Sequence, residues 1–591
     1  MYNIVIVCGG SGSAELQKGL YKVFGEDRFK VDIVINAYDN GKSTGECRRV
    51  FKNKILGPSD LRKNHLTRYQ IKYAKELMDP DSRESRLFHM FNARVSGIDY
   101  KDYYYHAKLM LDGADCETWI KQELSSLLDY FFFDGDNIRE SVKTVHFSDF
   151  SVSNVFYAAC AAKNNNSLRA AGQEMAKILG IEDNVHLISD TSLLLGAVTE
   201  SGLVLEDEGD IVSWKNPDDR ISSIFLKDVL GEDHIPSVDE SLPEEFRVSD
   251  IFRNADIIIF SSGTQWSSLI PTYMHKGFSE LISSGSARKY LVMNNIEDGD
   301  MYGVSSAQIC DTVAHYLDLS DITVVINDDA VPSMKLEKDG IRYIHGRLGS
   351  DRPKYHDPEK LVRCIFEDYY REALARSTVF FDFDGTIWNM RGSSRELKVG
   401  AENIDMLFGT VLSGNSYEHL RSTLGEHYRG RDLTVYCDYG NTFFRTDDPD
   451  NIGYLSDEFF IEHELLSELE KLREYRGKVT LRGNVIITIK PLKNRESELK
   501  KINAVLEKYC GRYRAYIAGN TSIDISRSGY DKAVILKIII GKNGLDFGDI
   551  VYIGNEVYKG SEVCIAEMGI SVLNVTDVFE CNCFLKIKEK A

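Results

Sequence analysis

The chain has 591 residues, of which 43% are hydrophobic and 27% are charged. Because a single hydrophobic core stops growing at roughly 250 to 300 residues, this length predicts two large domains or three smaller ones. The 91 acidic and 71 basic side chains give a net charge of −20, which argues against a nucleic-acid partner or an anionic membrane. No apolar run suits a membrane helix or a signal peptide, and the scattered cysteines form no CxxC pair, so we expect a cytoplasmic protein.

The first half of the chain alternates short, β-branched apolar runs with stretches of helical pattern. Continuous apolar runs are typical of strands buried on both faces, as in a parallel sheet that is wrapped by helices. The sequence therefore predicts an α/β fold with a Rossmann-like parallel sheet. The predicted strands are 3–8, 31–38, 185–189, 255–262, 289–295 and 322–328.

The first predicted strand runs directly into a glycine turn and then into a helix. Gly9, Gly10, Ser11 and Gly12 form this turn, where a phosphate could approach backbone N–H groups at the positive end of the helix. The turn lacks the GxGxxG spacing, so a plain strand-to-helix turn is the alternative.

Two acidic residues follow the second predicted strand. Asp39 lies at the end of that strand, and Asp60 lies in a turn that contains a proline. Together they are candidates to hold one Mg²⁺ that bridges a diphosphate, although either could instead cap a helix. The GKST run at 41–44 has Asn36 where a P-loop needs its first glycine, so a Walker A motif is rejected.

A Tyr-rich, mostly helical stretch at about 65–140 is interpreted as an insertion between the second and third strands. The later strand at 255–262 repeats the arrangement of strand, glycine loop and helix, and is followed by a second candidate anion site. Two such sites suit a nucleoside diphosphate better than a single phosphate. The candidate residues are Ser262, Gly263, Thr264 and Ser267.

The last third of the chain opens with a new apolar strand that ends in a pair of carboxylates. The run TVFFDFDGT places Asp382 and Asp384 two residues apart, on one face at the carboxyl end of the strand. One carboxylate can attack phosphorus, the second can donate and then accept a proton, and both can hold Mg²⁺.

Three further segments in this region carry residues of matching chemistry. Ser413 ends a second strand, and Lys532 begins a helix and supplies a cation for the phosphoryl charge. Asn555 and Glu556, with Glu562 as a further option, follow a third strand and could complete the metal shell.

The first 330 residues or so resemble the family of 2-phospho-L-lactate transferase and the bacterial gluconeogenesis factors. The family pattern GGTG, ADDGGSSGxLR, PGDxR, GNxxLAA and GPGSxxTSxxPN corresponds to CGGSG, AYDNGKSTGECRR, GPSDLRKN, VSNVFYAAC and SSGTQWSSLIPT. The resemblance adds Asn154 and Asn294 to the binding residues, while Asn40 replaces the second acid of ADD. It implies attack of an acceptor hydroxyl on a nucleoside-diphosphate-linked donor, although some relatives bind nucleotide-sugars as regulators.

The last 210 residues or so resemble phosphatases of the haloacid-dehalogenase superfamily, in the branch with phosphomannomutase and the trehalose- and sucrose-phosphate phosphatases. The motifs that carry the resemblance are DFDGT, SGNSYEHLRSTLG, GYDKAVILK and GNEVYKGSE. The resemblance implies an aspartyl-phosphate on Asp382, Mg²⁺, and an inserted α+β cap that sets substrate choice. Asn555 stands where the family has an aspartate.

We therefore predict a nucleotide-binding domain at 1–375 and a phosphatase domain at 376–591 with its cap at about 417–528. The predicted function is a bifunctional biosynthetic enzyme that transfers a phospho-linked group and hydrolyses a phosphomonoester. The alternatives are a nucleotide-sugar-binding regulator and a phosphosugar mutase. Its partners would be phosphorylated small molecules and a nucleoside-diphosphate ligand, and a homodimer stays open.

Overall fold

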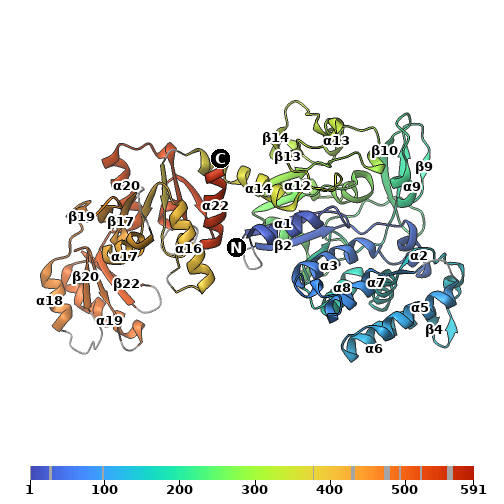
Figure 1. The fold of residues 1–591 in the computed structure, drawn as a ribbon, viewed down its shortest axis with the longest axis horizontal. Helices are drawn as coiled ribbons and strands as arrows, with labels where there is room; N and C mark the ends of the chain where they lie inside the picture. The colour runs from blue at the N-terminus through green and yellow to red at the C-terminus, as the bar shows by residue number, and fades with distance from the viewer. Residues whose placement is uncertain are drawn as a thin grey trace. The chain divides into compact units, whose positions relative to one another are not determined.

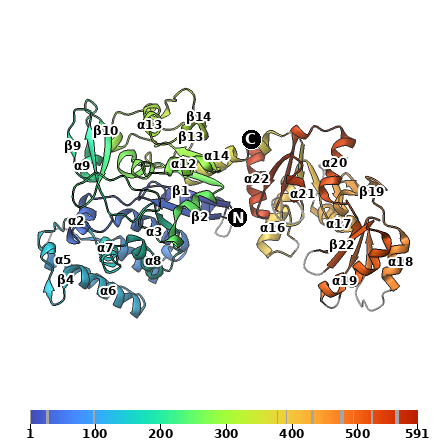
Figure 2. The same ribbon diagram turned by 180° about the vertical axis from the view of Figure 1, so that it is seen from behind.

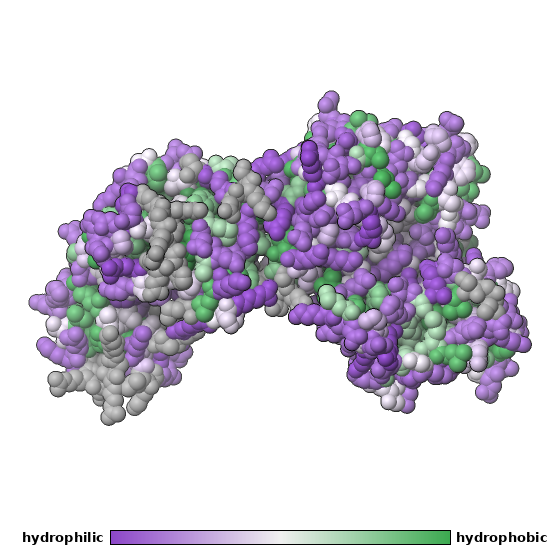
Figure 3. All heavy atoms as spheres, in the orientation of Figure 1, coloured by the Kyte–Doolittle hydropathy of each residue, from purple (hydrophilic) through white to green (hydrophobic). Residues whose placement is uncertain are grey.

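In the computed structural model the chain forms two compact units, Met1–Asp368 and Tyr369–Ala591 (Figures 1 and 2). Hydrophilic side chains cover most of the face seen in Figure 3. Within the residues that the structure describes, no helix is both long and apolar enough to cross a membrane. The described residues are 2–24, 29–95, 99–285, 287–376, 378–389, 391–427, 433–471, 479–491, 494–518, 522–555 and 563–590.

Unit 1 is built on a seven-stranded sheet in the order β14-β13-β12-β11-β1-β2-β7, and all neighbouring strands are parallel. The predicted α/β class with a parallel sheet is confirmed. The chain passes outward from β1 to β2 and β7, then continues from β11 on the other side of β1, so the strand order reverses between β1 and β11. The strands are β1 (Tyr2–Val7), β2 (Phe29–Ile35), β7 (Val185–Leu187), β11 (Ile257–Phe260), β12 (Arg288–Val292), β13 (Ile322–Asn327) and β14 (Arg342–Gly346).

The six predicted apolar runs form six of these strands. Their residues are apolar without alternation because both faces of the sheet are covered, as in β13, where all six residues are buried. The sequence analysis missed β14 and the antiparallel sheet of β8 (Leu194–Thr199), β9 (Val204–Leu205) and β10 (Ile221–Lys227). The helices are α1 (Ala14–Phe24), α2 (Lys42–Val50), α3 (Ser59–Lys72), α4 (Arg83–Asn92), α5 (Tyr100–Gly113), α6 (Thr118–Phe132), α7 (Val152–Lys163), α8 (Leu168–Leu179), α9 (Glu208–Ser213), α10 (Val248–Arg253), α11 (Ile270–Tyr273), α12 (Phe278–Ser284), α13 (Ser306–Val313) and α14 (Pro358–Tyr369).

Unit 2 has a second seven-stranded sheet in the order β19-β18-β17-β16-β15-β24-β25. The strands from β17 through β16, β15 and β24 to β25 are parallel, and β18 and β19 extend one edge in antiparallel fashion. The strands are β15 (Thr378–Phe381), β16 (Thr410–Leu412), β17 (Thr434–Cys437), β18 (Thr442–Arg445), β19 (Asp448–Tyr454), β24 (Ile550–Gly554) and β25 (Ser571–Asn574), with helices α15 (Arg371–Ala375), α16 (Ser394–Met406), α17 (Tyr417–His427), α20 (Lys532–Asn543), α21 (Val563–Ala566) and α22 (Val578–Lys590).

A separate antiparallel sheet in the order β20-β21-β23-β22 forms the cap of unit 2 together with two helices. The prediction of a cap from about residue 417 is wrong at its N-terminal end, since β17 pairs with β16 and the run 433–444 extends the main sheet. That run is apolar because it joins the main core, which a sequence pattern does not distinguish from a cap core. The cap elements are α18 (His463–Lys471), β20 (Val479–Arg482), β21 (Ile486–Ile489), α19 (Arg495–Leu506), β22 (Tyr513–Ala518) and β23 (Ser522–Arg527).

Candidate functional site

A cavity of about 200 Å³ lies in unit 1 beside the loops that follow β1 and β11, where the strand order reverses. In open α/β sheets, ligands bind at this kind of switch point, outside the carboxyl ends of the strands. Most of the binding residues predicted from sequence line this one cavity. They are Gly9, Gly10, Ser11, Gly12, Asp60, Ser262, Gly263, Thr264 and Asn294.

The first loop lies so close to the second loop and to α3 that glycine is required at two of its positions. A Cβ on Gly12 would lie 1.9 Å from the carbonyl oxygen of Ser262, and a Cβ on Gly10 would lie 2.5 Å from Asp60 Oδ1. Asn294 fixes the second loop, because its Oδ1 accepts a hydrogen bond of 2.8 Å from the backbone N–H of Gly263. These contacts hold both loops at the edge of the cavity.

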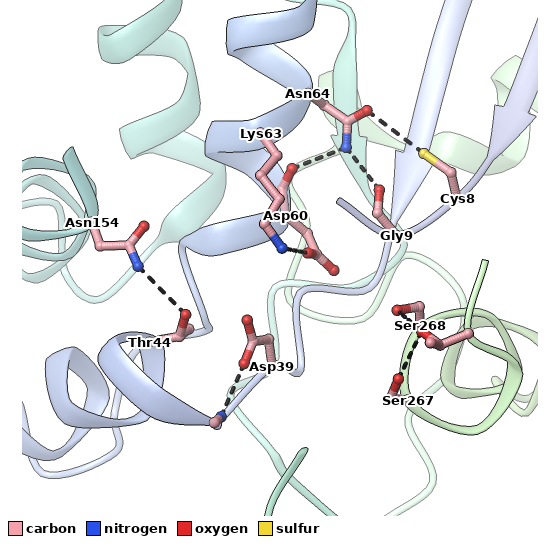
Figure 4. Close-up of polar contacts among 12 residues, drawn as sticks. Cys8, Gly9, Asp39, Thr44, Asp60, Lys63, Asn64, Asn154, Ser267 and Ser268 are labelled. Atoms are coloured by element: carbon pink, nitrogen blue, oxygen red, sulfur yellow. Dashed lines mark hydrogen bonds and ion pairs between the residues drawn. The ribbon is translucent and has the colours of Figure 1, made fainter. Parts of the chain in front are cut away.

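Asn64 ties the first glycine loop to α3 (Figure 4). Its Nδ2 donates to the carbonyl oxygens of Gly9 and Asp60, both at 2.9 Å. Its Oδ1 accepts hydrogen bonds from Ser13 Oγ at 3.1 Å and Gln17 Nε2 at 3.0 Å. The side chain therefore positions Asp60 against the loop, a role that sequence analysis did not assign.

Acidic side chains gather around a lysine at one side of the cavity. Lys63 Nζ lies 3.5 Å from Asp60 Oδ1 (Figure 4). Burial raises the pKa of Asp60, and the Asp39 carboxylate raises it further. Burial and the interaction with Asp39 likewise raise the pKa of Glu208 well above its usual range. The sequence analysis missed Lys63 and Glu208, the second of which lies far from Asp39 along the chain.

Asp39 and Asn40 do not line the cavity, but both interact with Glu208, which does. Asp39 Oδ1 accepts a hydrogen bond of 2.9 Å from the backbone N–H of Gly41. Asn40, which stands in place of a family acid, accepts from the backbone N–H of Glu208 at 2.9 Å and donates to the carbonyl of Leu195 at 3.0 Å. The amide thus holds the start of α9 and β8 together.

Besides Asp39, two predicted binding residues do not line the cavity. Asn154 Nδ2 lies 3.3 Å from Ser43 Oγ, so Asn154 supports the start of α2 instead. Ser267 directs its backbone N–H to Asp300 Oδ2 at 3.0 Å, and the next residue, Ser268, lines the cavity.

The segment 345–360 supplies another part of the cavity wall. Lys354, Tyr355 and His356 line the cavity. Burial lowers the pKa of His356 to about 4, and among the described residues no partner accepts or donates a hydrogen bond at its Nε2. A neutral imidazole therefore faces the binding space.

In unit 2 the central feature is a buried ion pair at the carboxyl edge of the main sheet. Lys532 Nζ donates to Asp382 Oδ1 at 2.9 Å, and the two side chains are only 4% and 9% exposed. Asp531 caps α20 by accepting from the backbone N–H of Val534 at 2.9 Å, which places Lys532 at the start of that helix. Ser413 is buried at the end of the neighbouring strand β16.

The loop after β15 brings the other predicted residues to the same edge. Asp384 is exposed, and Gly385 has a positive φ of 79°. Asn555 lies directly against this loop, because a Cβ on Gly385 would be 2.4 Å from Asn555 Nδ2. The predicted metal residues Glu556 and Glu562 lie outside the described residues. Within the described part, no group of three His, Cys, Asp or Glu side chains is arranged to hold a metal ion.

Comparison with known families gives the affiliation of unit 1. The family model described as 2-phospho-L-lactate transferase CofD matches residues 4–363. The chain belongs to this CofD family. A candidate gluconeogenesis factor of Aquifex aeolicus is 21% identical over 401 residues, which are 63% of this chain and 98% of that protein. The gluconeogenesis factor of Bacillus subtilis is 24% identical over 184 residues, 31% of this chain and 53% of its own length.

Solved structures similar to this chain include proteins of Bacillus halodurans, Aspergillus fumigatus and Bacteroides thetaiotaomicron. A UPF0052 family member from Bacillus halodurans has a TM-score of 0.42 and 17% identity, and covers 62% of this chain and 99% of its own. The trehalose-6-phosphate phosphatase of Aspergillus fumigatus has a TM-score of 0.27 and 14% identity over 39% of this chain and 98% of its own. A haloacid-dehalogenase-like hydrolase of Bacteroides thetaiotaomicron has a TM-score of 0.27 and 14% identity over 36% and 99%.

Proposed function

We propose that this CofD family member is a bifunctional enzyme of phosphorus chemistry. Unit 1 transfers a phospho-linked group from a nucleoside-diphosphate donor to an acceptor hydroxyl, and unit 2 hydrolyses a phosphomonoester. The main support for the hydrolysis is the buried pair of Asp382 and Lys532 at the carboxyl edge of a parallel sheet. A lysine held beside a carboxylate neutralises charge on a phosphoryl group that approaches that carboxylate.

The hydrolysis follows from the order of groups along this edge. An Asp382 oxygen forms a bond to phosphorus while the bond to the leaving oxygen breaks, and Asp384 gives that oxygen its proton. Water then attacks the aspartyl-phosphate, Asp384 accepts the proton of the water, and phosphate leaves. Ser413 and the backbone N–H groups after it would hold the phosphoryl oxygens.

The residues at both sites fit Mg²⁺, which binds through one or two carboxylates together with waters and substrate phosphates. In unit 2, Asp382 and Asp384 would hold it with Asn555, whose amide lies against their loop. In unit 1, Asp39 and Asp60 would hold it beside the glycine loops. When bound, the ion neutralises charge on phosphoryl oxygens.

The transferase proposal for unit 1 is supported by two glycine loops on one cavity, next to a lysine. In this reaction the acceptor oxygen bonds to phosphorus, the bond to the nucleoside monophosphate breaks, and the hydroxyl proton passes to solvent. Backbone N–H groups of the loops and Lys63 would stabilise the charge on the departing monophosphate.

The phosphatase is tested by phosphate release from a panel of phosphomonoesters with Mg²⁺. Asp382→Asn is expected to abolish turnover, whereas Asp405→Asn, an exposed carboxylate on α16, is expected to retain it. Equal turnover in both variants would refute the assignment, and an isomeric phosphate as product would establish a mutase.

The binding site of unit 1 is tested by calorimetric titration with GDP and UDP. Asp60→Asn is expected to weaken binding, and the exposed Asp218→Asn is the matched control. Binding of a nucleoside diphosphate without transfer to any acceptor would favour a nucleotide-sugar-binding regulator instead.

A further inference from the structure

A second cavity of unit 1 lies at the edge of the main sheet opposite to the glycine loops. It has a volume of about 510 Å³ and is formed by the first residues of β2, the residues at the start of β7, and the last turns of α1 and α3. The cavity therefore faces the amino ends of these parallel strands. Among the described residues, none that lines it also lines the cavity of the glycine loops.

Several charged side chains of this second cavity are balanced within its wall. Asp32 Oδ1 lies 2.9 Å from His186 Nε2, and Asp32 Oδ2 lies 3.1 Å from Lys30 Nζ. Asp183 Oδ1 accepts a hydrogen bond of 2.9 Å from Arg169 Nη1. These groups hold the ends of the strands and of α8 together, so a ligand is not needed to satisfy them.

Arg68 is not balanced in this way. Its side chain is 8% exposed, and its Nη1 is buried without a hydrogen-bond partner among the described residues. The Glu182 carboxylate lies 3.8 Å from Arg68 Nη2 and is itself 83% exposed. The guanidinium packs on the Tyr21 ring, with Cζ 4.8 Å from the ring centroid, which limits its movement. A buried cation with so distant a counter-charge costs stability unless an anion approaches it.

A hydrogen-bond acceptor of the same cavity also lacks a partner. Asn184 Nδ2 donates to the carbonyl oxygen of Val31 at 2.8 Å, which orients the amide and identifies the other atom as the oxygen. That Oδ1 is buried, and no donor in the described part of the chain reaches it. The cavity thus presents an incompletely paired cation at Arg68 and an unpaired acceptor at Asn184.

The remaining wall of the second cavity is largely apolar. Cavities of this size that combine an apolar wall with a few polar groups are typical of small-molecule sites. The apolar lining residues are Phe29, Val31, Ile71 and Ile181.

We propose that this second cavity binds a free α-amino acid with an apolar side chain. The carboxylate of the amino acid would pair with Arg68, and its ammonium would donate to Asn184 Oδ1 and to the Glu182 carboxylate. Its side chain would lie against the apolar wall. A phosphate dianion suits the cavity less well, because the acidic side chains of Asp32, Asp183 and Glu182 line it and repel a second negative charge.

Calorimetric titration of the full chain with three compounds that share a phenyl ring tests the ligand class. L-Phenylalanine carries both charged groups, 3-phenyllactate lacks the ammonium, and 2-phenylethylamine lacks the carboxylate. We expect L-phenylalanine to bind at least about 10-fold more tightly than either analogue, as the loss of one charge-assisted hydrogen bond implies. Equal or tighter binding of an analogue, or absence of binding by both L-phenylalanine and L-leucine, would overturn the proposal.

Two variants locate the binding. Arg68→Met keeps a long side chain and removes the cation, so it is expected to weaken L-phenylalanine binding at least about 10-fold. Arg86→Met, at a half-exposed arginine on α4, is the matched control and should bind normally. Ile71→Trp narrows the cavity while leaving Arg68 in place, and it should also abolish binding. Wild-type affinity in either Arg68→Met or Ile71→Trp would overturn the site.

The amino-acid site is separated from the proposed nucleotide site by its ligand. Both Lys63 and Arg68 lie on α3, so each variant is titrated with GDP and with L-phenylalanine. Lys63→Met is expected to weaken GDP binding alone, and Arg68→Met to weaken L-phenylalanine binding alone. Absence of GDP binding in the wild-type chain would refute the nucleotide site only, whereas loss of L-phenylalanine binding in Lys63→Met would overturn the second site.

Discussion

Arg48 offers a test of what holds the Asp39 segment of unit 1 in place. The side chain is completely buried on α2, and its Nη1 donates to the carbonyl oxygens of Tyr38 and Asp39 at 3.1 and 3.2 Å. Its Nη2 donates to the carbonyl of Leu193 at 2.6 Å. Burial lowers its pKa to about 10, so the guanidinium stays charged at neutral pH and joins the Asp39 segment to β8.

Replacing Arg48 by methionine removes these donors while keeping a long side chain in the space. Three buried carbonyl groups then lack their partner, and each such group costs about 1 to 3 kcal/mol. Because some carbonyls can relax, we expect Arg48→Met to lower the free energy of unfolding by about 3 to 5 kcal/mol. The adjacent Arg49 is 57% exposed and pairs with Glu46, so Arg49→Met should cost less than about 1 kcal/mol.

Urea unfolding of the full chain, followed by tryptophan fluorescence, measures both variants under one condition. Three of the four tryptophans lie in unit 1, and the fourth, Trp388, lies in unit 2. The fluorescence change therefore reports mainly on the unfolding of unit 1. A loss within 1 kcal/mol of the Arg49→Met value would mean that the three carbonyl contacts of Arg48 do not stabilise this loop.

Two further predictions concern packing and pH. Gly12→Ala places a Cβ 1.9 Å from the Ser262 carbonyl oxygen and should weaken nucleoside-diphosphate binding about 10-fold or more in calorimetry, whereas Gly113→Ala, at the exposed end of α5, enters open space and should bind normally. Burial lowers the pKa of His275 to about 4, so acid protonates the unfolded chain first and stability falls as pH drops from about 6.5 toward 4. His275→Gln should therefore reduce the loss of unfolding free energy between pH 7 and pH 5 by about 2 kcal/mol, and an unchanged loss would contradict the burial argument.

The sequence predicted those parts of the sites that follow directly from strand ends. Asp60 and the glycine turns could be assigned because an apolar run followed by small residues predicts the carboxyl edge of a parallel sheet. Glu208 and His356 could not, because each reaches the cavity from an element whose place depends on contacts far away in the chain. Asn154, which fits a family motif, contacts the start of α2, and its role in binding stays a prediction.

The predicted N-terminal boundary of the cap was wrong for a related reason. The run 433–444 has the apolar character of a buried strand, and nothing local distinguishes a strand of the main sheet from one of the cap. The pairing of Thr434 with Thr410 assigns this run to the main sheet, and the composition of the run does not encode that pairing. The departure at Asn555 was visible in the sequence, but its contact with the Asp382 loop required the fold.

The two sites place a lysine beside a carboxylate by different means. In unit 1, Asp60 and Lys63 lie three residues apart on one helix, so their separation is set by helix geometry. In unit 2, Lys532 is the first residue of the helix that follows the cap, and Arg514 of the cap donates to the carbonyl of Tyr530 at 2.5 Å. A shift of the cap would therefore act directly on the chain segment that places Lys532 beside Asp382.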